Sequence, residues 1–313
     1  MKTSEKKEVK EKVKKEDSQK VKNIKFHILA IFCIIIFCAS ICPVTMQNDT
    51  YYTIKIGKHI INTKTVDMQD PFSWHELPYT YPHWAYDVMI YLIYNLGGFL
   101  GIFISTIVFA CILGILMYCT NYKISKNKLI SFAITIGGMF LIKDYIAARA
   151  QLVTFILLEL TILLIENFLE KKKAGYAIGI IVISTAIANL HCAVWPFFFV
   201  IFLPYIAEYL IFTVIDAQPV YRIRKKYYDI KIKNYNKKIE KEAIEENKKI
   251  LDEKLKKVII AKEKFEEKNA KILKNREAKR KEPYKIRYNK NKNAKWLILI
   301  MAICVLTGLL TPL

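Results

Sequence analysis

The chain is poor in acidic residues and has no paired-cysteine motif. Only 28 Asp and Glu residues stand against 49 Lys and Arg residues, and the formal net charge is +21. None of the seven cysteines has the C-x-x-C spacing of a metal or redox site, and all of them lie in or beside apolar runs. We therefore interpret the cysteines as small buried apolar side chains, with little support for disulfide or metal roles.

The N-terminus also lacks the features of a cleavable signal peptide. Its charged region is long, its apolar region extends over residues 24–46, and no small-x-small cleavage site follows. The first apolar run is therefore predicted to be an uncleaved membrane anchor.

Long apolar runs are what the sequence has in abundance. Hydrophobic residues make up 53% of the chain, and they are concentrated in blocks. A bilayer-spanning helix needs about 20 mostly apolar residues, and shorter runs extend into their polar flanks. Seven runs qualify: residues 24–46, 99–119, 129–142, 152–168, 176–190, 195–215 and 296–313. The predicted fold class is all-α, a polytopic membrane bundle of about seven transmembrane helices.

Charge sets the predicted orientation of these helices. Residues 1–25 hold ten Lys against five acids, and residues 216–295 hold 28 Lys and Arg against 13 acids. Further lysines lie between the second and third runs and at 171–173. Placing all of these segments in the cytoplasm satisfies the positive-inside rule and predicts a multi-pass protein of the cell membrane. The basic residues are diluted with Glu over two segments, which favours contact with anionic lipid headgroups over nucleic-acid binding.

Four regions follow along the chain. They are a basic cytoplasmic tail at 1–25, a six-span body at 26–215 that includes an outer loop at 47–88, a charged cytoplasmic insertion at 216–295, and a seventh span at 296–313. Because the sequence stops directly after an apolar stretch, we expect it to be the front part of a longer protein.

The cytoplasmic insertion is predicted to be a long charged helix or a pair of helices. No Gly or Pro occurs between Tyr221 and Glu282. Apolar residues recur near heptad spacing at Leu251, Leu255, Val258, Phe265 and Ile272, with Lys262 and Asn269 interrupting the series. This pattern favours a solvated helix or a weak coiled coil, and residues 221–282 are a candidate site for a cytoplasmic protein partner.

The outer loop begins with an acid and contains two predicted interfacial helices. Asp49 follows the first apolar run, and Tyr52, Ile56 and Ile60 then fall on one helical face. Residues 67–74 are predicted to form turns, and residues 86–96 a second amphipathic helix that ends at two glycines. The aromatic group between them is predicted to lie in the membrane interface: Tyr79, Tyr81, His83 and Trp84.

Four stretches carry a resemblance to a known family. They are Asp49-Thr-Tyr-Tyr with Gly57-Lys-His-Ile-Ile, Asp70-Pro-Phe-Ser with His83-Trp84, Ala148-Arg149-Ala150-Gln151, and Ala188-Asn189-Leu190-His191. Their order and predicted topology resemble bacterial membrane glycosyltransferases of the C type, which use polyprenyl-phosphate-linked sugars as donors. The chain departs from the family pattern in having Ala150 in place of Pro, a single acid at Asp49, and no distal spans.

The resemblance implies a role for each candidate residue. Asp49 would act as a general base, or would bind a divalent metal near the donor phosphate. Arg149, with Lys143 nearby, would pair with that phosphate, since a guanidinium binds phosphate in a bidentate manner. The remaining candidates for binding phosphate or acceptor are His83, His191 and Asp70. No cofactor is firmly implied, and the lipid-linked sugar is the donor substrate.

Plainer roles compete with each of these. Asp49 could cap the interfacial helix, Asp70 could set a turn before its proline, and Arg149 could extend to the headgroups. His191 could be a satisfied interfacial histidine. Glu159 lies near the middle of the fourth apolar run, where an acid is costly, so we expect it to face the bundle interior, to be protonated or to line a polar cavity. Its plainer role is that of a neutral acid hydrogen bonded to a Ser or Thr.

Two other functions remain open at this stage. A transporter or lipid flippase would use intramembrane polar groups such as Glu159, although no internal repeat is evident. A non-catalytic membrane scaffold would use the charged insertion to recruit a partner.

Overall fold

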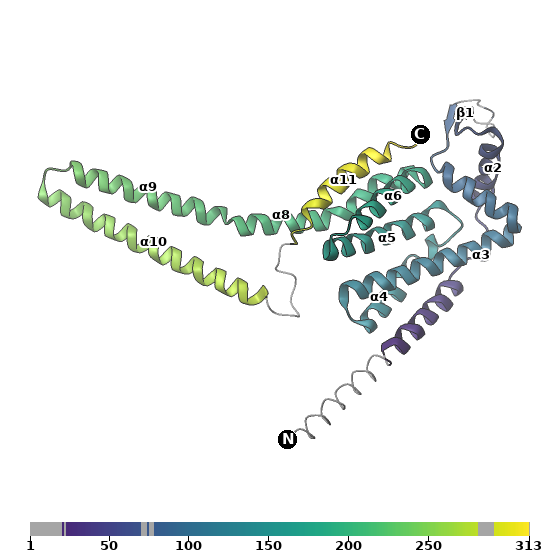
Figure 1. The fold of residues 1–313 in the computed structure, drawn as a ribbon, viewed down its shortest axis with the longest axis horizontal. Coiled ribbons are helices and arrows are strands. Elements are labelled where there is room, and N and C mark those ends of the chain that lie inside the picture. The colour runs from purple at the N-terminus through teal and green to yellow at the C-terminus, as the bar shows by residue number, and fades with distance from the viewer. Residues whose placement is uncertain (1–20, 22, 70–73, 75–77, 281–290, 313) are drawn as a thin grey trace, which may run out of the picture. The chain divides into compact units, whose positions relative to one another are not determined.

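The computed structural model describes residues 21, 23–69, 74, 78–280 and 291–312. These residues are helical apart from connections and one short pair of strands (Figure 1). The chain divides into two compact units, one made of residues up to Leu203 together with Trp296–Leu313, and the other of Pro204–Lys295. The predicted tail at 1–25 and the candidate Asp70 lie largely or wholly outside the described residues.

Within the part of the chain that the structure describes, seven apolar helical segments correspond to the seven apolar runs. Four are long and apolar enough to cross a membrane: Asn23–Ser40, α3 (Trp84–Ser125), α5 (Ala150–Lys171) and the helical run Cys192–Lys241. Three apolar helices are shorter: α4 (Lys128–Leu141), α6 (Ala174–Leu190) and α11 (Lys295–Gly308). Large apolar side chains such as Ile28, Phe32, Leu141 and Val182 are exposed on them. These features are those of a helical membrane bundle.

The run from Cys192 is built from several short elements. In chain order these are η2 (Cys192–Val194), α7 (Trp195–Phe198), η3 (Phe199–Phe202), α8 (Leu203–Ala217) and α9 (Pro219–Lys241).

The first helix packs into the bundle through small side chains. Ile34 and Cys38 are fully buried in a cluster with Leu113 of α3 and Met139 of α4. Gly114 of α3 lies against them, and a Cβ there would come within 2.8 Å of Ile34. Small residues at such crossings let apolar helices approach closely, which is how helices gain packing energy where the surroundings are apolar.

A glycine divides α3 into two parts. Gly98 has φ +61° and ψ −151°, a conformation that L side chains rarely adopt, and it lies inside a helix of 42 residues. The kink separates the segment before it, Trp84 to Gly97, from the long apolar part after it. This confirms the prediction of a separate helix that ends at the two glycines.

Three helices end at a lysine in the left-handed region. Lys64, Lys126 and Lys172 follow α2 (Asn48–Thr63), α3 and α5 with φ values of 58°, 56° and 49°. Each lysine's N–H donates to a carbonyl four residues earlier, which satisfies one of the helix's terminal acceptors. A cation there also complements the negative end of the helix dipole.

The lysine-rich turns gather at one end of the first unit. Lys123 near the end of α3 forms an ion pair with Glu170 near the end of α5. Lys172 after α5 places its Nζ 4.8 Å from the ring centroid of Trp296, which begins the apolar part of α11. The ends of α3 and α5 and the start of α11 therefore lie together.

The opposite ends of the same helices meet the outer loop. The indole Nε1 of Trp84 donates to Asn189 Oδ1 at the end of α6 over 3.1 Å. Asn189 Nδ2 in turn donates to the Leu310 carbonyl after α11, also over 3.1 Å. The backbone N–H of Cys192 donates to the Pro82 carbonyl. The start of α3 and the ends of α6 and α11 are thus joined by hydrogen bonds.

Helix α2 packs directly on the first part of α3 (Figure 1). Its buried residues are Thr50, Thr53, Ile54, Ile56, Gly57 and Ile60. On the face predicted to be apolar, Ile56 and Ile60 are buried and Tyr52 is 37% exposed. Gly57 has no side chain, so α2 approaches the α3 backbone closely there.

The predicted turns at 67–74 contain the start of a strand pair, which sequence reasoning missed. β1 (Asp67–Gln69) pairs antiparallel with β2 (Pro78–Thr80), with Met68 opposite Tyr79. Two residues of the predicted interfacial aromatic group contact other elements of the protein. Tyr81 is 0% exposed in a cluster with Ile56 and Ile60, and Trp84 is hydrogen bonded to α6.

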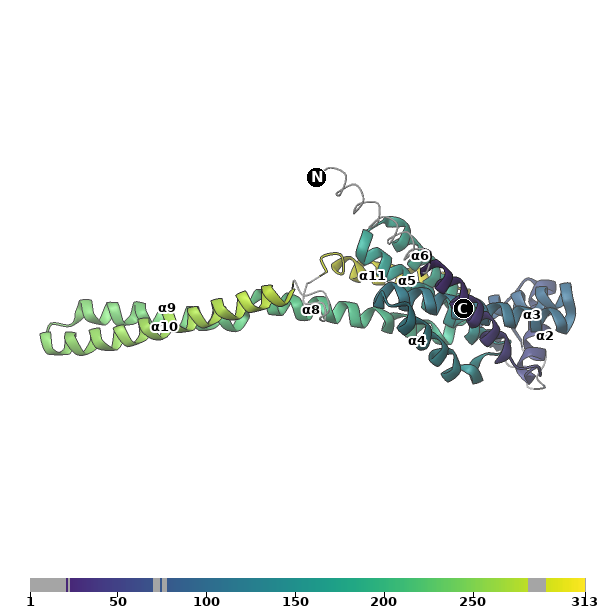
Figure 2. The ribbon, with the colours of Figure 1, turned by 90° about the horizontal axis from the view of Figure 1, so that it is seen from below.

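The second unit contains a helical hairpin. α9 is followed by α10 (Glu245–Arg280), and the two helices lie side by side (Figures 1 and 2). Half-buried positions repeat at alternating steps of four and three in both helices. They are Tyr221, Lys225, Tyr228, Ile232, Tyr235 and Ile239 in α9, and Leu251, Leu255, Val258, Lys262, Phe265 and Asn269 in α10. The predicted heptad pattern thus forms a seam within one chain.

The two residues that interrupt the apolar series serve this seam. Lys262 Nζ lies 2.7 Å from the Asp229 carboxylate, and Asn269 Nδ2 donates to Gln218 Oε1 over 3.3 Å. Between these contacts, the Phe265 ring stacks on the Tyr221 ring. Polar pairs at seam positions fix the register of such helices.

Replacing Gly57 with Ala should destabilise the protein. A Cβ there would lie 2.7 Å from Tyr91 Cβ and would clash with the Asp87 carbonyl, and overpacking of this kind costs about 1–3 kcal/mol. We expect the midpoint of thermal unfolding in detergent to fall by a few degrees, because each kcal/mol lost moves the midpoint of a large chain by about 2 °C.

Gly137 in α4 provides the matched control. It meets no atom within 4 Å, so Gly137→Ala should leave the midpoint unchanged or raise it through helix propensity. An equal decrease in both variants would contradict the close approach of α2 and α3.

Candidate functional site

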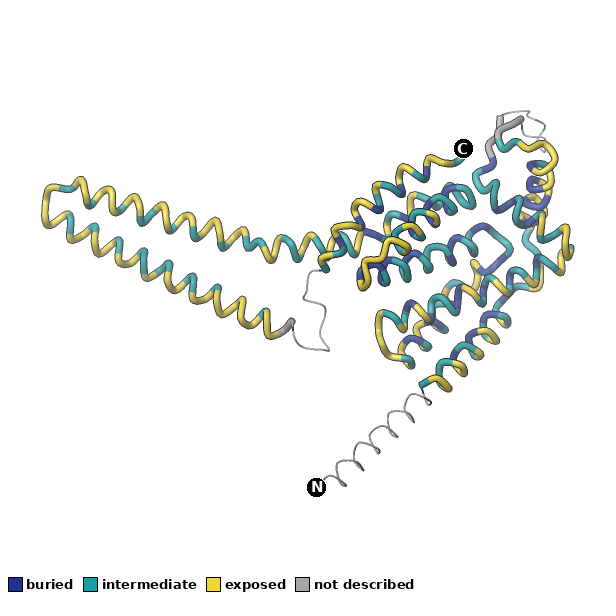
Figure 3. Tube along the Cα trace, viewed as in Figure 1, coloured by how far each residue is buried: buried dark blue, intermediate teal, exposed yellow. Residues whose placement is uncertain are grey.

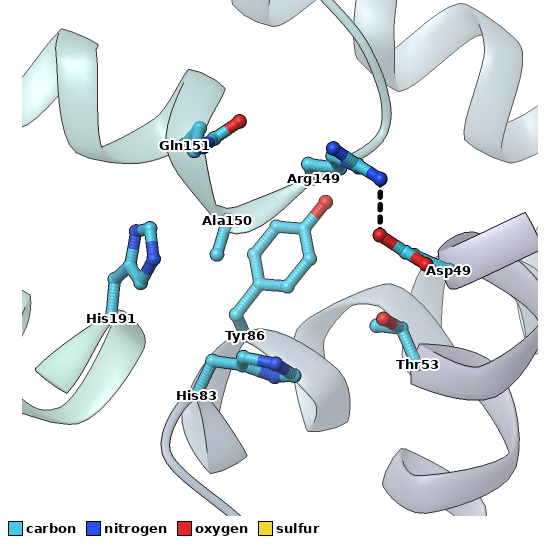
Figure 4. Close-up of a pocket in the computed structure, with 8 residues that line it drawn as sticks. All are labelled: Asp49, Thr53, His83, Tyr86, Arg149, Ala150, Gln151 and His191. Carbon is cyan, nitrogen blue, oxygen red and sulfur yellow. Dashed lines mark hydrogen bonds and ion pairs between the residues drawn. The ribbon is translucent and has the colours of Figure 1, made fainter. Parts of the chain in front are cut away.

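Four of the predicted site residues, widely separated in sequence, line one cavity of about 160 Å³. They are Asp49 from α2, His83 before α3, Arg149 before α5 and His191 after α6 (Figure 4). Thr53, Tyr86, Ala150 and Gln151 complete the lining. The Tyr86 ring lies in the middle of the group, with its hydroxyl directed toward Arg149.

Asp49 and Arg149 form an ion pair across the cavity. Asp49 lies in the first turn of α2, where its charge complements the positive end of the helix dipole. The N-cap position belongs to Gln47, which makes no side-chain cap, and Arg149 Nη2 donates to Asp49 Oδ2. The Asp49 side chain is 63% exposed and the Arg149 side chain 40% exposed. Such an exposed pair contributes little stability, and a bound anion can displace the carboxylate.

Arg149 owes its position to the chain just before α5. It occupies the N-cap position with an extended backbone, at φ −132° and ψ 155°. The preceding Ala148 carbonyl accepts a hydrogen bond from Thr50 Oγ1 over 3.4 Å, which ties this connection to α2. The side chain therefore extends from the start of α5 toward α2 rather than along the bundle surface.

His83 is held by a second, buried carboxylate. Its Nδ1 lies 2.8 Å from both carboxylate oxygens of Asp87, one turn later in α3. Asp87 is 0% exposed. With Nδ1 engaged, Nε2 is the ring nitrogen left for a ligand in the cavity. Asp87 was missed by sequence reasoning, although its spacing of four residues from His83 placed both on one helical face.

Burial and charge act against each other in this pair. Burial lowers the pKa of His83, but the hydrogen bond and charge of Asp87, together with the charge of Asp49, raise that pKa above its ordinary value. Burial raises the pKa of the Asp87 carboxyl, while hydrogen bonds to His83 and Thr53 oppose the rise. The interaction favours a cationic His83 at the cavity wall.

His191 is a neutral counterpart to His83. Its Nδ1 lies 3.1 Å from the Thr154 hydroxyl, which also donates to the Ala150 carbonyl. Burial, followed by the nearby charge of His83, lowers the pKa of His191 below its ordinary value. His191 therefore offers an uncharged imidazole to a ligand, while His83 offers a charged one.

The other candidates lie elsewhere. Lys143 is exposed in η1 (Lys143–Tyr145), with its Nζ 5.0 Å from the Phe140 ring centroid, and it does not line the cavity. Asp70 is outside the described residues. Glu159 is half-buried in α5 and faces Thr120 of α3, away from the cavity lining. The expectation that Glu159 faces the bundle interior agrees with this position.

The cavity combines charges suited to an anionic ligand with bases suited to proton transfer. Arg149 and His83 supply positive charge from two sides, and Asp49 supplies an exposed carboxylate between them. Among the described residues, no three His, Cys, Asp or Glu side chains are arranged as metal ligands. A divalent metal near Asp49 and the donor phosphate stays a prediction, and no step is assigned to it.

Comparisons with protein-family models, curated proteins and solved structures find no match to the chain. The resemblance to C-type glycosyltransferases therefore rests on the four quoted stretches alone.

Replacing Asp87 with Asn should lower the pKa of His83. The variant keeps the shape of the side chain but removes its negative charge, so burial is left as the main influence and favours the neutral imidazole. We expect His83 to titrate below its ordinary value of 6.5, measured by NMR of histidine-labelled protein in detergent.

His191 serves as the internal control for this titration. Its pKa is lowered chiefly by its own burial, so it should remain below its ordinary value in the variant. An unchanged His83 titration would show that the Asp87 charge does not act on the imidazole.

Proposed function

We propose that this protein is a membrane glycosyltransferase of the C type, which transfers a sugar from a polyprenyl-phosphate donor to an acceptor at the outer face of the membrane. The observation that supports this most is the convergence of Asp49, His83, Arg149 and His191 in one cavity. All four stretches that carry the resemblance supply these residues, and the third also supplies Gln151.

In this proposal, the donor phosphate binds between Arg149 and His83. Charge-assisted hydrogen bonds from a guanidinium and an imidazolium are among the stronger interactions available to a phosphate. Both side chains reach the same cavity from different elements, so a phosphate between them would be contacted from two sides. The polyprenyl chain would extend along the apolar surfaces of the neighbouring helices.

Phosphate binding would also activate Asp49. An anion that takes the Arg149 guanidinium releases the Asp49 carboxylate from its ion pair. The free carboxylate then removes the proton from an acceptor hydroxyl as that oxygen bonds to the anomeric carbon of the sugar. The bond from the anomeric carbon to the phosphate oxygen breaks, and the polyprenyl phosphate leaves with its electron pair.

The proposal includes a topology. All seven apolar segments cross the membrane of a bacterial cell, with the lysine-rich end of the first unit in the cytoplasm and the cavity at the outer face. Two observations support it: the lysines after α3 and α5 lie at one end of the helices, and the cavity is built from α2, the start of α3, the start of α5 and the end of α6. The positive-inside rule connects these ends to the two sides of the membrane.

Replacing Asp49 with Asn should abolish sugar transfer without loss of membrane protein. The amide keeps the size of the side chain but cannot accept the proton, and loss of a general base reduces rates by about 10²–10⁴-fold. The assay follows radiolabel from a panel of polyprenyl-phosphate-linked sugars into envelope material, using membranes that contain the full chain.

Asp144→Asn is the matched control, because Asp144 is an exposed acid in η1 that does not line the cavity. It should retain full transfer. Transfer at the normal rate by the Asp49 variant would rule out its role as the base.

Replacing Arg149 with Gln should weaken binding of the donor phosphate group. A hydrogen bond to a charged group contributes about 1.5–3 kcal/mol, so affinity should fall by about ten- to a hundredfold. Titration calorimetry with undecaprenyl phosphate in detergent measures this directly. Lys143→Gln removes an equivalent charge outside the cavity and should bind normally. Equal losses in both variants would mean that general charge, not this cavity, binds the phosphate.

A further inference from the structure

One side of the cavity carries no ion pair to hold a charged group. In Figure 4, the ion pair of Asp49 and Arg149 lies on one side and the His191 ring on the other. Burial lowers the pKa of His191, so its imidazole is neutral at neutral pH. The proposed donor phosphate binds between Arg149 and His83, which leaves the His191 side for another part of the ligand.

The hydroxyl of Thr154 determines which nitrogen of His191 carries the proton. A threonine hydroxyl has one proton to donate and two lone pairs that accept. Thr154 Oγ1 donates its proton to the Ala150 carbonyl over 2.8 Å and lies 3.1 Å from His191 Nδ1. Because the hydroxyl proton is used in the shorter of these contacts, the proton in the other contact comes from the ring. Neutral His191 therefore carries its proton on Nδ1.

The other ring nitrogen of His191 is then a hydrogen-bond acceptor. A neutral imidazole has one N–H group and one nitrogen with a free lone pair, which here is Nε2. No group in the described part of the chain is hydrogen bonded to this nitrogen, and His191 lines the cavity. A lone pair repels the oxygens of a phosphate and attracts the proton of a hydroxyl or an N–H group. The ligand group beside His191 must therefore be a donor.

Gln151 adds an amide to the same cavity. It follows Ala150 in the first turn of α5, and its side chain lines the cavity with His191 (Figure 4). A hydroxyl can donate its proton to an imidazole nitrogen and accept one from an amide N–H group at the same time. An ionised phosphate only accepts, and a polyprenyl chain does neither. The combination of imidazole and amide thus suits a hydroxyl best.

Helix α5 keeps the Thr154 hydroxyl in place. The Thr154 residue is 1% exposed, and Figure 3 shows α5 as buried or half-buried over most of its length. A buried hydroxyl that rotated away from the Ala150 carbonyl would lose a hydrogen bond that water cannot replace. The tautomer of His191 is therefore set by the fold before any ligand binds.

We propose that His191 Nε2 accepts a hydrogen bond from a hydroxyl group of the transferred sugar, and that Thr154 is a positioning residue that holds His191 in the tautomer able to accept it. The donor lipid is then bound in two parts, with its phosphate between Arg149 and His83 and a sugar hydroxyl at His191. This inference rests on the proposed function, because that function brings a sugar into the cavity.

NMR of the ring nitrogens in histidine-labelled, full-length protein in detergent tests the tautomer. Above its pKa, His191 should carry a proton on Nδ1 and none on Nε2. Thr154→Val keeps the shape of the side chain but removes the hydroxyl, so the proton should move largely to Nε2, the position that free histidine prefers. Thr154→Ser restores a hydroxyl and should keep the proton on Nδ1.

Thr161→Val is the matched control. Thr161 is buried in the same helix, and its hydroxyl donates to the Leu157 carbonyl over 2.8 Å, but it does not line the cavity. This variant loses the same kind of hydrogen bond as Thr154→Val and should leave the tautomer of His191 unchanged.

Titration calorimetry of the same variants tests the ligand. The probes are undecaprenyl phosphate and undecaprenyl phosphate linked to glucose, galactose or mannose. Thr154→Val should bind the preferred sugar lipid about two- to tenfold more weakly, the usual effect of one hydrogen bond, and the sugar-free lipid normally. Thr154→Ser and Thr161→Val should bind both normally. In the unchanged protein, the sugar lipid should shift the His191 Nε2 resonance, and the sugar-free lipid should not.

Four results would count against the inference. A proton on Nε2 of His191 in the unchanged protein would contradict the assigned tautomer. A shift of this resonance by the sugar-free lipid would mean that phosphate binds there. Equal weakening of both lipids by Thr154→Val would give Thr154 a general structural role. Binding of a sugar lipid without any shift of His191 would overturn this inference alone, whereas failure of every probe to bind would overturn the proposed function with it.

Discussion

The contact between Gly57 of α2 and the start of α3 is the constraint on which the cavity depends. Because Gly57 has no side chain, the two helices approach until its Cα lies against the Asp87 backbone. The same approach excludes water from the Asp87 carboxylate and brings Thr53 to it. It also sets the distance from Asp49, two turns earlier in α2, to the end of the connection that carries Arg149.

The two carboxylates near the cavity are suited to different tasks because their surroundings differ. Asp87 is fully buried and engaged by His83, so its charge acts through the imidazole rather than on a ligand. Asp49 is exposed and held only by Arg149, whose guanidinium another anion can claim. Asp87 therefore orients a histidine, whereas Asp49 is free to exchange partners.

The sequence predicted the helices well and the tertiary contacts only in part. Apolar runs and the glycine pair at 97–98 are local features, so the seven helical segments and the kink at Gly98 could be read directly. Tyr81 was predicted to lie in the membrane interface, and its burial could not be predicted because it depends on α2 folding over it, which no local pattern records. Asp87 was missed for the same reason: an acid in an amphipathic helix normally faces water, and only the close approach at Gly57 buries it.

The polar residues at the hairpin seam help to determine how its two helices pair. Lys262 and Asn269 weaken the apolar series of α10, yet each has a polar partner: Asp229 in α9 and Gln218 directly before it. These contacts help to specify the pairing of the two helices. Once the seam is filled within one chain, its apolar positions are not available to a partner. The face of α9 that points away from α10 stays exposed, and its charge is positive.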